Sequence, residues 1–534
     1  MNLARIIEEH PPGAPALLCA RAPLGEGEDP VSGPVTYGEL GSAAARWRQG
    51  LAQCGVGRSD RVAILLENSA DFVLAYLAVL GLGAVAVPLN PASPGPELER
   101  ELRAVQPVAA VVGSMGSSTI SSLPGSVAAL RAIVVIEAPA SLSGAGAGAG
   151  AWAGAWAGAF GGDGVGPLIV DPSSWSSLPG IEVVDCLGDD LAILLFTAGT
   201  AGSPKAAQLT HANLASNLDQ IQHHPGRAVH VDDVSLGVLP MFHIYGLNAV
   251  LGLTLAAGAS LVLVAHFDTA TVGELVQRCG VTILAGVPSM FESLSASDLP
   301  GDVFSGLRAV ISGASALDRH SAETFRERFG HVIVEGYGLT EASPVVTSCI
   351  PGEELQPGSI GPPLPGMEVR LVDEDGLDAM EGDMGEIWVR GPNVFSGYWE
   401  DPAATALAVD GDGWLRTGDV AVAGSDGYLH IVDRAKDLII VSGFNVYPAE
   451  VEEVLIMHPG VAEVAVVGGS GQAISETVNA YIVCDGPTSP DRAELVELCH
   501  RHLARYKCPT SFTFVESIPH GLTGKLLRRA LRQP

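Results

Sequence analysis

Short apolar runs alternate with longer helical ones in the first half of the chain. RVAILLEN (61–68) and VAAVVGS (108–114) flank SADFVLAYLAVLGLG (69–83). The alternation returns in GVTILAGVPSMFESL (280–294) and LRAVISGASALD (307–318). Strands separated by helices at this spacing predict βαβ units and a mostly parallel sheet with helices packed on it.

The pattern changes at about residue 358. EVRLVDEDG (368–376), GEIWVRGPNVFSGYW (385–399) and GYLHIVDR (427–434) are strand-like runs between turns, which predicts a β-rich subdomain. Helix–strand alternation then resumes in 448–469 and ends in an amphipathic helix at 491–506. We therefore expect an α/β fold. A large N-terminal domain (1–433) has parallel-rich sheets sandwiched by helices plus the β-rich subdomain, and a small α+β C-terminal domain spans 434–534.

Two segments have unusual composition. Residues 143–166 are low-complexity Gly, Ala and Trp, and a surface insertion is expected there, either a bland linker or a sticky one. Residues 234–267 contain no Asp, Glu, Lys or Arg, which is long enough for a membrane span. Polar interruptions and a central glycine favour a buried helix followed by a buried strand, with peripheral membrane contact left open.

Charge and cysteine content narrow the class of protein. A net charge of −31 leaves no basic stripe for phosphate backbones, so nucleic acid is not an expected partner. The eight cysteines form no CxxC pair, and the N-terminus lacks a signal-peptide pattern. We therefore expect a cytoplasmic protein, with membrane association as an alternative. Oligomeric state cannot be inferred.

Lysine is rare. Of 29 cationic side chains only Lys205, Lys436, Lys507 and Lys525 are lysines. A compact ammonium is not equivalent to a forked guanidinium, so these lysines can mark sites that need one. Three of them fall inside motif-like stretches, although chance accounts for any single one.

Four stretches carry candidate chemistry, each with a plainer alternative. LLFTAGTAGSPKAAQLTH (194–211) fits either a phosphate cradle or a glycine-rich turn, and lacks the Walker pattern. In VIVEGYGLTEASPVV (332–346), the Thr340–Glu341 pair could hold Mg²⁺ or cap a surface turn. Asp419 could accept hydrogen bonds from ribose or be a turn residue after Gly418. Lys525 lies in a glycine-framed turn, IPHGLTGKLLRRAL (518–531).

Together and in this order, these stretches closely resemble the adenylate-forming superfamily of acyl-CoA synthetases, adenylation domains and firefly luciferase. The resemblance runs from about Val35 to the C-terminus, and residues 432–468 look most like the bacterial long-chain fatty acyl-CoA ligases. It implies a two-step reaction with ATP and CoA as co-substrates and Mg²⁺ as cofactor. A fatty acid of medium or long chain first becomes acyl-AMP with release of pyrophosphate, and the CoA thiol then takes the acyl group.

The resemblance also implies roles for individual residues. The catalytic set is Lys525, Thr340, Glu341, Lys205 and His243, with His243 near the acyl and thiol tunnels. Glu341 and Thr197 would hold the metal. Lys436 is the hinge about which a mobile C-terminal domain rotates, bringing Ser442 and Gly443 to the CoA channel. The nucleotide would contact Thr197, Ala198, Gly199, Thr200, Ala201, Gly202, Ser203, Lys205, Gly313, Ala314, Ser315, Glu335, Gly336, Tyr337, Gly338, Thr340, Asp419, Arg434 and Lys525.

The sequence departs from the family at three positions in the phosphate loop. Ala198, Ala201 and Ala206 replace the usual Ser, Thr or Gly, so fewer pyrophosphate contacts are expected. Two alternatives to a CoA ligase follow. One is an acyl-AMP ligase that delivers the acyl group to the phosphopantetheine of an acyl carrier protein. The other, of a different class, is a non-catalytic nucleotide-binding protein.

Overall fold

The structure is a computed structural model of the 534-residue chain. It describes residues 1–19, 33–121, 123, 130–136, 167–197, 205–225, 229–314, 317, 319–349, 359–373, 376–380, 382–424, 428–434, 439–442, 444–446, 448–470, 476–486, 490–519 and 531. The low-complexity segment 143–166 lies outside these residues.

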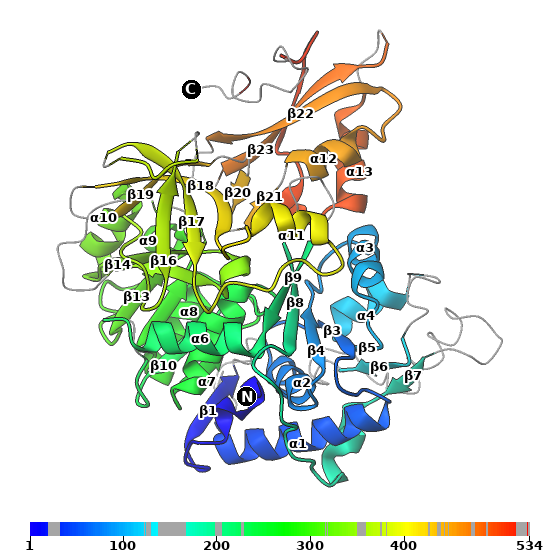
Figure 1. Ribbon diagram of the computed structural model, residues 1–534, viewed down its shortest axis with the longest axis vertical. Helices are drawn as coiled ribbons and strands as arrows, with labels where there is room; N and C mark the ends of the chain where they lie inside the picture. Colours follow the sequence, from blue (N-terminus) through cyan, green and yellow to red (C-terminus); the bar gives the residue numbers. More distant parts are fainter. Residues whose placement is uncertain are drawn as a thin grey trace.

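A seven-stranded sheet is formed by the first part of the chain (Figure 1). All its neighbouring pairs are parallel except the last, an antiparallel hairpin. In spatial order its strands are β7 (Leu168–Val170), β6 (Ala132–Val135), β5 (Ala109–Val112), β3 (Arg61–Leu65), β4 (Val85–Pro88), β8 (Leu191–Thr197) and β9 (Lys205–Thr210).

An eight-stranded sheet follows. Its centre is parallel, and each edge carries one antiparallel strand. In spatial order its strands are β15 (Val345–Ser348), β14 (Ile333–Gly338), β13 (Ala309–Ser312), β12 (Ile283–Gly286), β10 (Val234–Gly237), β11 (Ser260–Leu263), β1 (Pro15–Cys19) and β2 (Val35–Thr36).

The described helices between residues 3 and 408 include those that cover both large sheets (Figure 1). In order along the chain they are η1 (Leu3–Ile7), α1 (Tyr37–Gln53), α2 (Ala70–Gly81), α3 (Gly95–Val105), α4 (Ser114–Ser121), η2 (Pro172–Ser177), α6 (His211–Gln222), η3 (Tyr245–Gly252), α7 (Leu253–Ala256), α8 (Thr269–Cys279), α9 (Pro288–Ala296), α10 (Arg319–Phe329), η4 (Thr340–Ala342) and α11 (Pro402–Ala408).

Strand β3 shows why the first sheet is sandwiched. Its alternate residues Val62 and Ile64 belong to the largest core, with α1 and α2. Ala63 and Leu65 point to a second core, which includes the apolar face of α3. A strand buried on both faces reads as a continuous apolar run, as RVAIL does. The expected α/β architecture is confirmed.

The charge-free segment begins with β10, which was not predicted, and then forms η3, α7 and β11, as expected for a buried helix and strand. Residues Tyr245–Gly252 are π-helical, a geometry concentrated at functional sites. Among the residues that the structure describes, no helix is long and apolar enough to cross a bilayer.

A four-stranded antiparallel sheet forms the expected β-rich subdomain. Its strands are β16 (Glu368–Val372), β17 (Met384–Arg390), β18 (Leu415–Ala423) and β19 (Leu429–Arg434).

The C-terminal region has its own core, formed from Ile439 onward. The predicted boundary near residue 434 is compatible with this and stays a prediction. The region, orange to red in Figure 1, lies above α3 and the ends of β8 and β9. It contains β20 (Ile439–Val441), β21 (Phe444–Val446), α12 (Pro448–Leu455), β22 (Val461–Ser470), β23 (Glu476–Cys484), α13 (Arg492–His502), η5 (Arg505–Lys507) and β24 (Ser511–Phe514).

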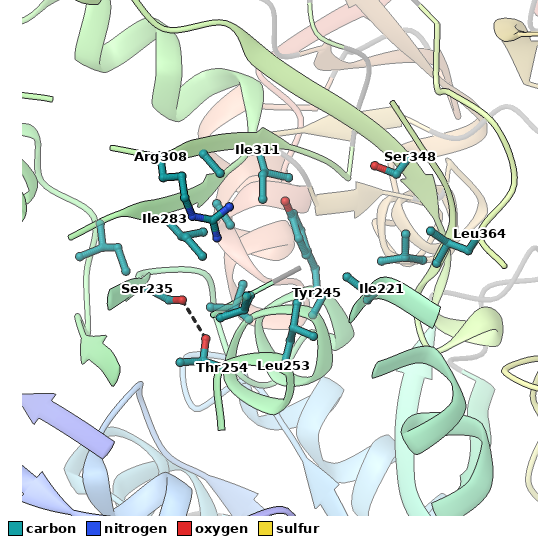
Figure 2. A pocket seen from close by; sticks show the side chains of 17 residues that line it. Ile221, Ser235, Tyr245, Leu253, Thr254, Ile283, Arg308, Ile311, Ser348 and Leu364 are labelled. Atoms are coloured by element: carbon teal, nitrogen blue, oxygen red, sulfur yellow. Dashed lines mark hydrogen bonds between the residues drawn. The ribbon is translucent and has the colours of Figure 1, made fainter. Parts of the chain in front are cut away.

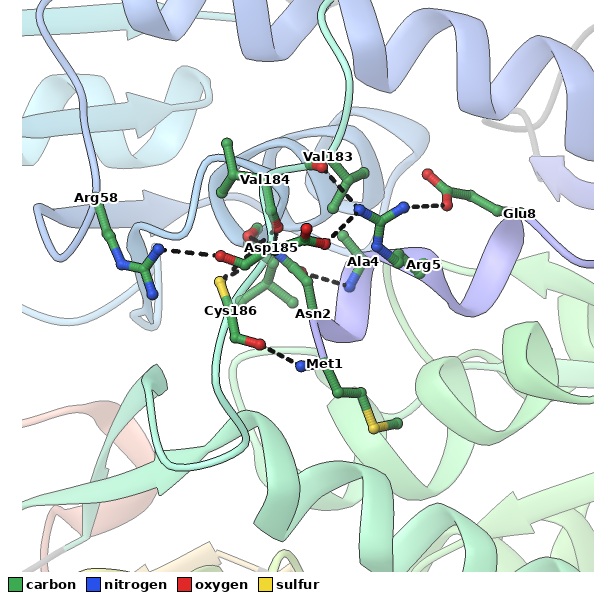
Figure 3. A network of polar contacts seen from close by, with 11 residues as sticks. Met1, Asn2, Ala4, Arg5, Glu8, Arg58, Val183, Val184, Asp185 and Cys186 are labelled. Atoms are coloured by element: carbon green, nitrogen blue, oxygen red, sulfur yellow. Dashed lines mark hydrogen bonds and ion pairs between the residues drawn. The ribbon is translucent and has the colours of Figure 1, made fainter.

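The N-terminal segment is held by a buried amide (Figure 3). Asn2 Nδ2 donates to the carbonyl oxygens of Leu80 at 2.7 Å and Val184 at 3.0 Å, while its Oδ1 accepts from the Ala4 N–H at 3.0 Å. The N-terminal ammonium donates to the Cys186 carbonyl. Asn2 thus joins the first turn of the chain to α2 and to the segment before β8.

Candidate active site

The β8–β9 hairpin holds the two ends of the phosphate-loop motif. Thr197 ends β8 and pairs in register with Lys205, the first residue of β9. The Thr197 hydroxyl donates to the Lys205 carbonyl at 3.5 Å. The residues between them lie outside the described residues, so the positions of Ala198, Gly199, Thr200, Ala201, Gly202 and Ser203 stay predictions.

Tyr398 brings Lys205 and Glu341 together. Its hydroxyl donates to Glu341 Oε1 at 2.7 Å, and Lys205 Nζ lies 5.1 Å from the centre of its ring. The Phe395 N–H donates to the Glu341 carbonyl at 2.8 Å. Glu341, beside Thr340 on η4, is half-buried and hydrogen-bonded by a side chain from a distant loop. A capping pair on the open surface is therefore the wrong description.

A single carboxylate near Lys205, at one end of the expected phosphate loop, fits Mg²⁺. This ion is usually held by one or two carboxylates with waters and substrate phosphates, not by a cage of protein ligands. No group of three or more His, Cys, Asp or Glu side chains able to hold a metal occurs in the described part of the chain. The donor chemistry of Glu341 and Thr197 thus suits a shared protein–phosphate site.

The expected adenine-binding residues follow two adjacent parallel strands. Gly313 and Ala314 come directly after β13, and Glu335 to Gly338 lie in β14. A Cβ at Gly338 would lie 2.2 Å from the Pro344 carbonyl oxygen, so only glycine fits. Ser315 lies outside the described residues. Carboxyl ends of parallel strands are the usual ligand edge of such sheets.

Glu335 lies in a largely dehydrated position. Its Oε1 accepts from the Leu317 N–H at 2.9 Å. Burial raises the pKa of Glu335 to about 7, and the Leu317 N–H opposes this shift.

One hydrogen bond joins Asp419, an expected ribose residue, to Tyr337, an expected adenine-binding residue. The Tyr337 hydroxyl donates to Asp419 Oδ2 at 2.7 Å, linking β14 to β18. Asp419 pairs in register with Arg434 on β19, so these two residues are neighbours across the small sheet. Because β18 continues to Ala423, Asp419 is a strand residue, and the turn alternative is wrong.

Three buried asparagines hold the loop that carries Thr340 and Glu341. Asn393 Nδ2 donates to the Ala342 carbonyl at 2.6 Å, and Asn248 Nδ2 donates to the Ser343 carbonyl at 2.7 Å. Asn217 Nδ2 donates to the Val345 carbonyl at 2.8 Å. All three asparagines have 0% exposure. The sequence motifs did not indicate these residues or Tyr398, although the amide of Asn248 inside the charge-free run was a signal for one of them.

His243 faces the C-terminal region. Its ring centre lies 5.3 Å from that of Phe444 on β21. Removal from bulk water, with the charge of Lys507 second, lowers the pKa of His243 to about 4, so the ring is neutral at pH 7. Ser442, in the turn between β20 and β21, is exposed and has φ 50°.

Several of the other expected residues cannot be placed. Gly443, Lys436 and Lys525 lie outside the described residues, and for Arg434 only the backbone is described.

An apolar cavity of about 50 Å³ lies between η3, α7 and the strands β10, β12 and β13 (Figure 2). Tyr245 lines it and also packs against Gly313, where a Cβ would lie 3.0 Å from the ring. The cavity therefore adjoins Gly313, one of the residues expected to contact the adenine.

Three polar residues in the cavity wall, Ser235, Thr254 and Arg308, already have partners. The Thr254 hydroxyl donates to the Ser235 hydroxyl at 2.9 Å. The Arg308 guanidinium pairs with Asp233, with Nε 3.0 Å from Oδ1. The cavity is therefore suited to hydrocarbon and not to a second charged group.

The fold and the site define an enzyme that uses a nucleotide to activate an acid. The chain belongs to the AMP-binding enzyme family: the family model matches residues 4–399, and the model of the AMP-binding enzyme C-terminal domain matches residues 450–525. The resemblance stated from the sequence is thereby confirmed.

Three relatives illustrate the family. The chain is 34% identical to the long-chain-fatty-acid–CoA ligase of Salmonella typhimurium over 92% of this chain and 87% of the relative. It is 33% identical to 4-coumarate–CoA ligase 5 of Oryza sativa over 93% and 89%. Among solved structures, amide bond synthetase McbA from Marinactinospora thermotolerans superposes with a TM-score of 0.82 at 28% identity, covering 100% and 99% of the two chains. The chain is an acid–thiol ligase of the adenylate-forming type, with ATP and CoA as co-substrates.

Proposed function

We propose that the acid is a medium- or long-chain fatty acid. The observation that carries this proposal is the apolar cavity beside Tyr245 and Gly313, where Ser235, Thr254 and Arg308 in the wall are already paired. Similarity to long-chain-fatty-acid–CoA ligases supports the same class of acid.

In the first step a carboxylate oxygen of the acid attacks the α-phosphorus of ATP, and the bond to pyrophosphate breaks. Lys205 and the preceding loop bind the leaving phosphates, Thr340 contacts the α-phosphate, and Lys525 stabilises the developing charge. Asp419 and Arg434 orient the ribose. Glu341 and Thr197 would hold Mg²⁺, which when bound neutralises phosphate charge.

In the second step the CoA sulfur attacks the acyl carbonyl carbon, and AMP leaves. Ser442 and Gly443 border the path of the pantetheine arm, and the neutral ring of His243 lies between this path and the acyl site. Lys436 provides the hinge. An acyl carrier protein is the alternative acceptor.

A panel of saturated acids of increasing chain length tests the proposal. Purified enzyme is incubated with each acid and ATP, with and without CoA, and AMP and acyl-CoA are measured. We expect medium or long acids to give the highest kcat/KM and Lys525→Ala to abolish pyrophosphate release. Acyl-AMP without acyl-CoA would support the carrier-protein alternative. A preference for aromatic or very short acids would refute the proposed substrate.

The cavity itself can be tested with one variant. Leu253 on α7 lines the cavity, so truncating its side chain enlarges the space that an acyl tail can fill (Figure 2). Leu253→Ala should move the optimum toward longer acids without changing KM for ATP. Leu255→Ala, a buried change on the same helix at a residue that does not line the cavity, is the control. An unchanged chain-length profile in Leu253→Ala would contradict the assignment.

A further inference from the structure

Lys507 is the lysine to which the reaction gives no role. It lies in η5 of the C-terminal region and is 5% exposed. Lysine is among the residues least often buried, and a buried ammonium without partners is strongly unfavourable. Its position therefore has to be explained by what surrounds it.

Two carboxylates from different parts of the molecule hold this ammonium. Lys507 Nζ donates to Glu97 Oε1 at 2.6 Å and to Glu450 Oε1 at 3.0 Å. Glu97 is on α3, next to the seven-stranded sheet, whereas Glu450 is on α12 of the C-terminal region. The second oxygen of Glu97 accepts from the Ala504 N–H at 3.2 Å. One carboxylate of the N-terminal domain thus binds the C-terminal region twice.

The cluster is buried and electrostatically strong. The side chains of Lys507, Glu97 and Glu450 are 7%, 6% and 9% exposed. Burial alone would lower the pKa of Lys507, but Tyr506, Glu450 and Glu97 outweigh it, so the pKa lies above its ordinary value and the ammonium stays charged. Removing one partner from such a cluster leaves an uncompensated buried charge.

A chain of aromatic contacts connects this cluster to the active site. Tyr506 adjoins Lys507, and its ring is stacked on that of Phe444 with the centres 4.4 Å apart. Phe444 in turn contacts His243. The β20–β21 hairpin, which carries Ser442, is therefore held against His243 in the arrangement in which Lys507 bridges α3 and α12.

We infer that Lys507 is a positioning residue for acyl transfer to the thiol: by bridging Glu97 and Glu450 it docks the C-terminal region so that the β20–β21 hairpin lies at the acyl site. This inference rests on the proposed two-step function. On the proposed function, adenylation uses Lys525 in a different arrangement of the C-terminal region, so loss of the Lys507 bridge should affect the two half-reactions unequally.

Measuring the half-reactions separately tests the inference. Acid-dependent exchange of pyrophosphate into ATP reports adenylation, and thioester formation from preformed acyl-AMP and CoA reports transfer. We expect Lys507→Met to lower the transfer rate at least tenfold and to leave exchange within about threefold. Glu97→Gln should act in the same direction, because it removes the N-terminal partner.

The control is Glu494→Gln. Glu494 pairs with His458 at 3.4 Å within the C-terminal region and is 65% exposed, so its loss should change neither half-reaction. A rescue variant combines Lys507→Met with Glu97→Gln and Glu450→Gln. Since this removes all three charges, it should recover part of the transfer rate.

Hydrogen exchange measures docking independently of activity. Peptides covering residues 95–105 and 444–455 should exchange faster in Lys507→Met than in wild type or Glu494→Gln. Equal loss of both half-reactions, or an unchanged transfer rate, would overturn the inference. If wild type forms acyl-AMP but no acyl-CoA, CoA is not the acceptor, and the carrier-protein alternative is supported. In that case, a hydrogen-exchange rate in Lys507→Met equal to that of wild type at both peptides would still refute docking through Lys507.

Discussion

The Tyr398 hydroxyl orients the Glu341 carboxylate, to which we assign metal binding. Removing this hydroxyl alone tests that role without disturbing the packing of the ring. Tyr398→Phe removes the 2.7 Å hydrogen bond to Glu341. It keeps the ring beneath Lys205, 5.1 Å from Nζ, and the contact with Phe395, whose ring centre lies 4.9 Å away. The variant therefore changes one polar interaction and little else.

The size of the effect follows from the charge of the acceptor. A hydrogen bond to a charged group contributes roughly 1.5–3 kcal/mol. If the bond is kept in the transition state of adenylation, its loss lowers kcat/KM for ATP by roughly 10- to 150-fold, at 1.36 kcal/mol per factor of ten. Because the hydroxyl is at the edge of the site, stability should change by less than about 1 kcal/mol.

The assay is pyrophosphate exchange over a range of ATP and Mg²⁺ concentrations. Tyr37→Phe is the matched control, because it removes a hydroxyl that is bonded to Ala259 O at 2.8 Å, in the core of the eight-stranded sheet. We expect Tyr37→Phe to lower the melting temperature and to leave ATP kinetics unchanged. A Tyr398→Phe enzyme with kcat/KM for ATP within twofold of wild type would refute the assigned role.

Two further predictions concern docking and folding. Burial, with repulsion by Glu97 second, raises the pKa of Glu101 to about 8, while Lys507 and Arg100 oppose the shift and Glu450 adds to it. At a pH between the ordinary carboxyl pKa and about 8, Glu101 is therefore protonated when the C-terminal region is docked and ionised when it is not. Docking takes up a proton in this range, so it weakens as the pH rises toward 8. The rate of acyl transfer in Glu101→Gln relative to wild type should therefore increase between pH 6 and about 9, and a constant ratio would contradict this. Asn2→Ala removes the four hydrogen bonds of the Asn2 side chain (Figure 3) and should cost roughly 2–4 kcal/mol in urea unfolding, whereas Glu8→Ala, which removes an exposed ion pair, should cost under about 1 kcal/mol. Equal costs would show that the Asn2 amide is not what holds the segment.

Much of the fold could be predicted from the sequence because its signals are local. The apolar run RVAIL predicts a strand, and the segment after it predicts a helix. The alternation of strand and helix along 61–83 predicts a sheet with helices on both faces, and therefore a strand buried on both sides. The motifs around Thr340, Asp419 and Lys205 were also visible, because adjacent residues carry them.

The rest depends on contacts between distant residues. The Tyr398–Glu341 bond spans 57 positions, and the Lys507–Glu97 bond spans 410. No pattern in either stretch alone indicates its partner. The sequence marks Lys507 as one of four lysines. Its role follows only from the structure, which places it against Glu97 on α3. The π-helical turn at Tyr245 was likewise read as an ordinary helix, because apolar periodicity does not distinguish the two.

Because the C-terminal region has a core of its own, it can be swapped as a unit between members of the family. The apolar cavity is built entirely from residues before 365, whereas the hairpin against His243 belongs to a unit with a hydrophobic core of its own. Such a unit can be replaced by that of another family member without rebuilding the acid-binding half. Few contacts must be kept: the replacing region needs an ammonium group that binds Glu97 and an aromatic ring that packs against His243. Acid choice and acceptor choice can therefore diverge independently, which fits a family whose members include both CoA ligases and an amide bond synthetase.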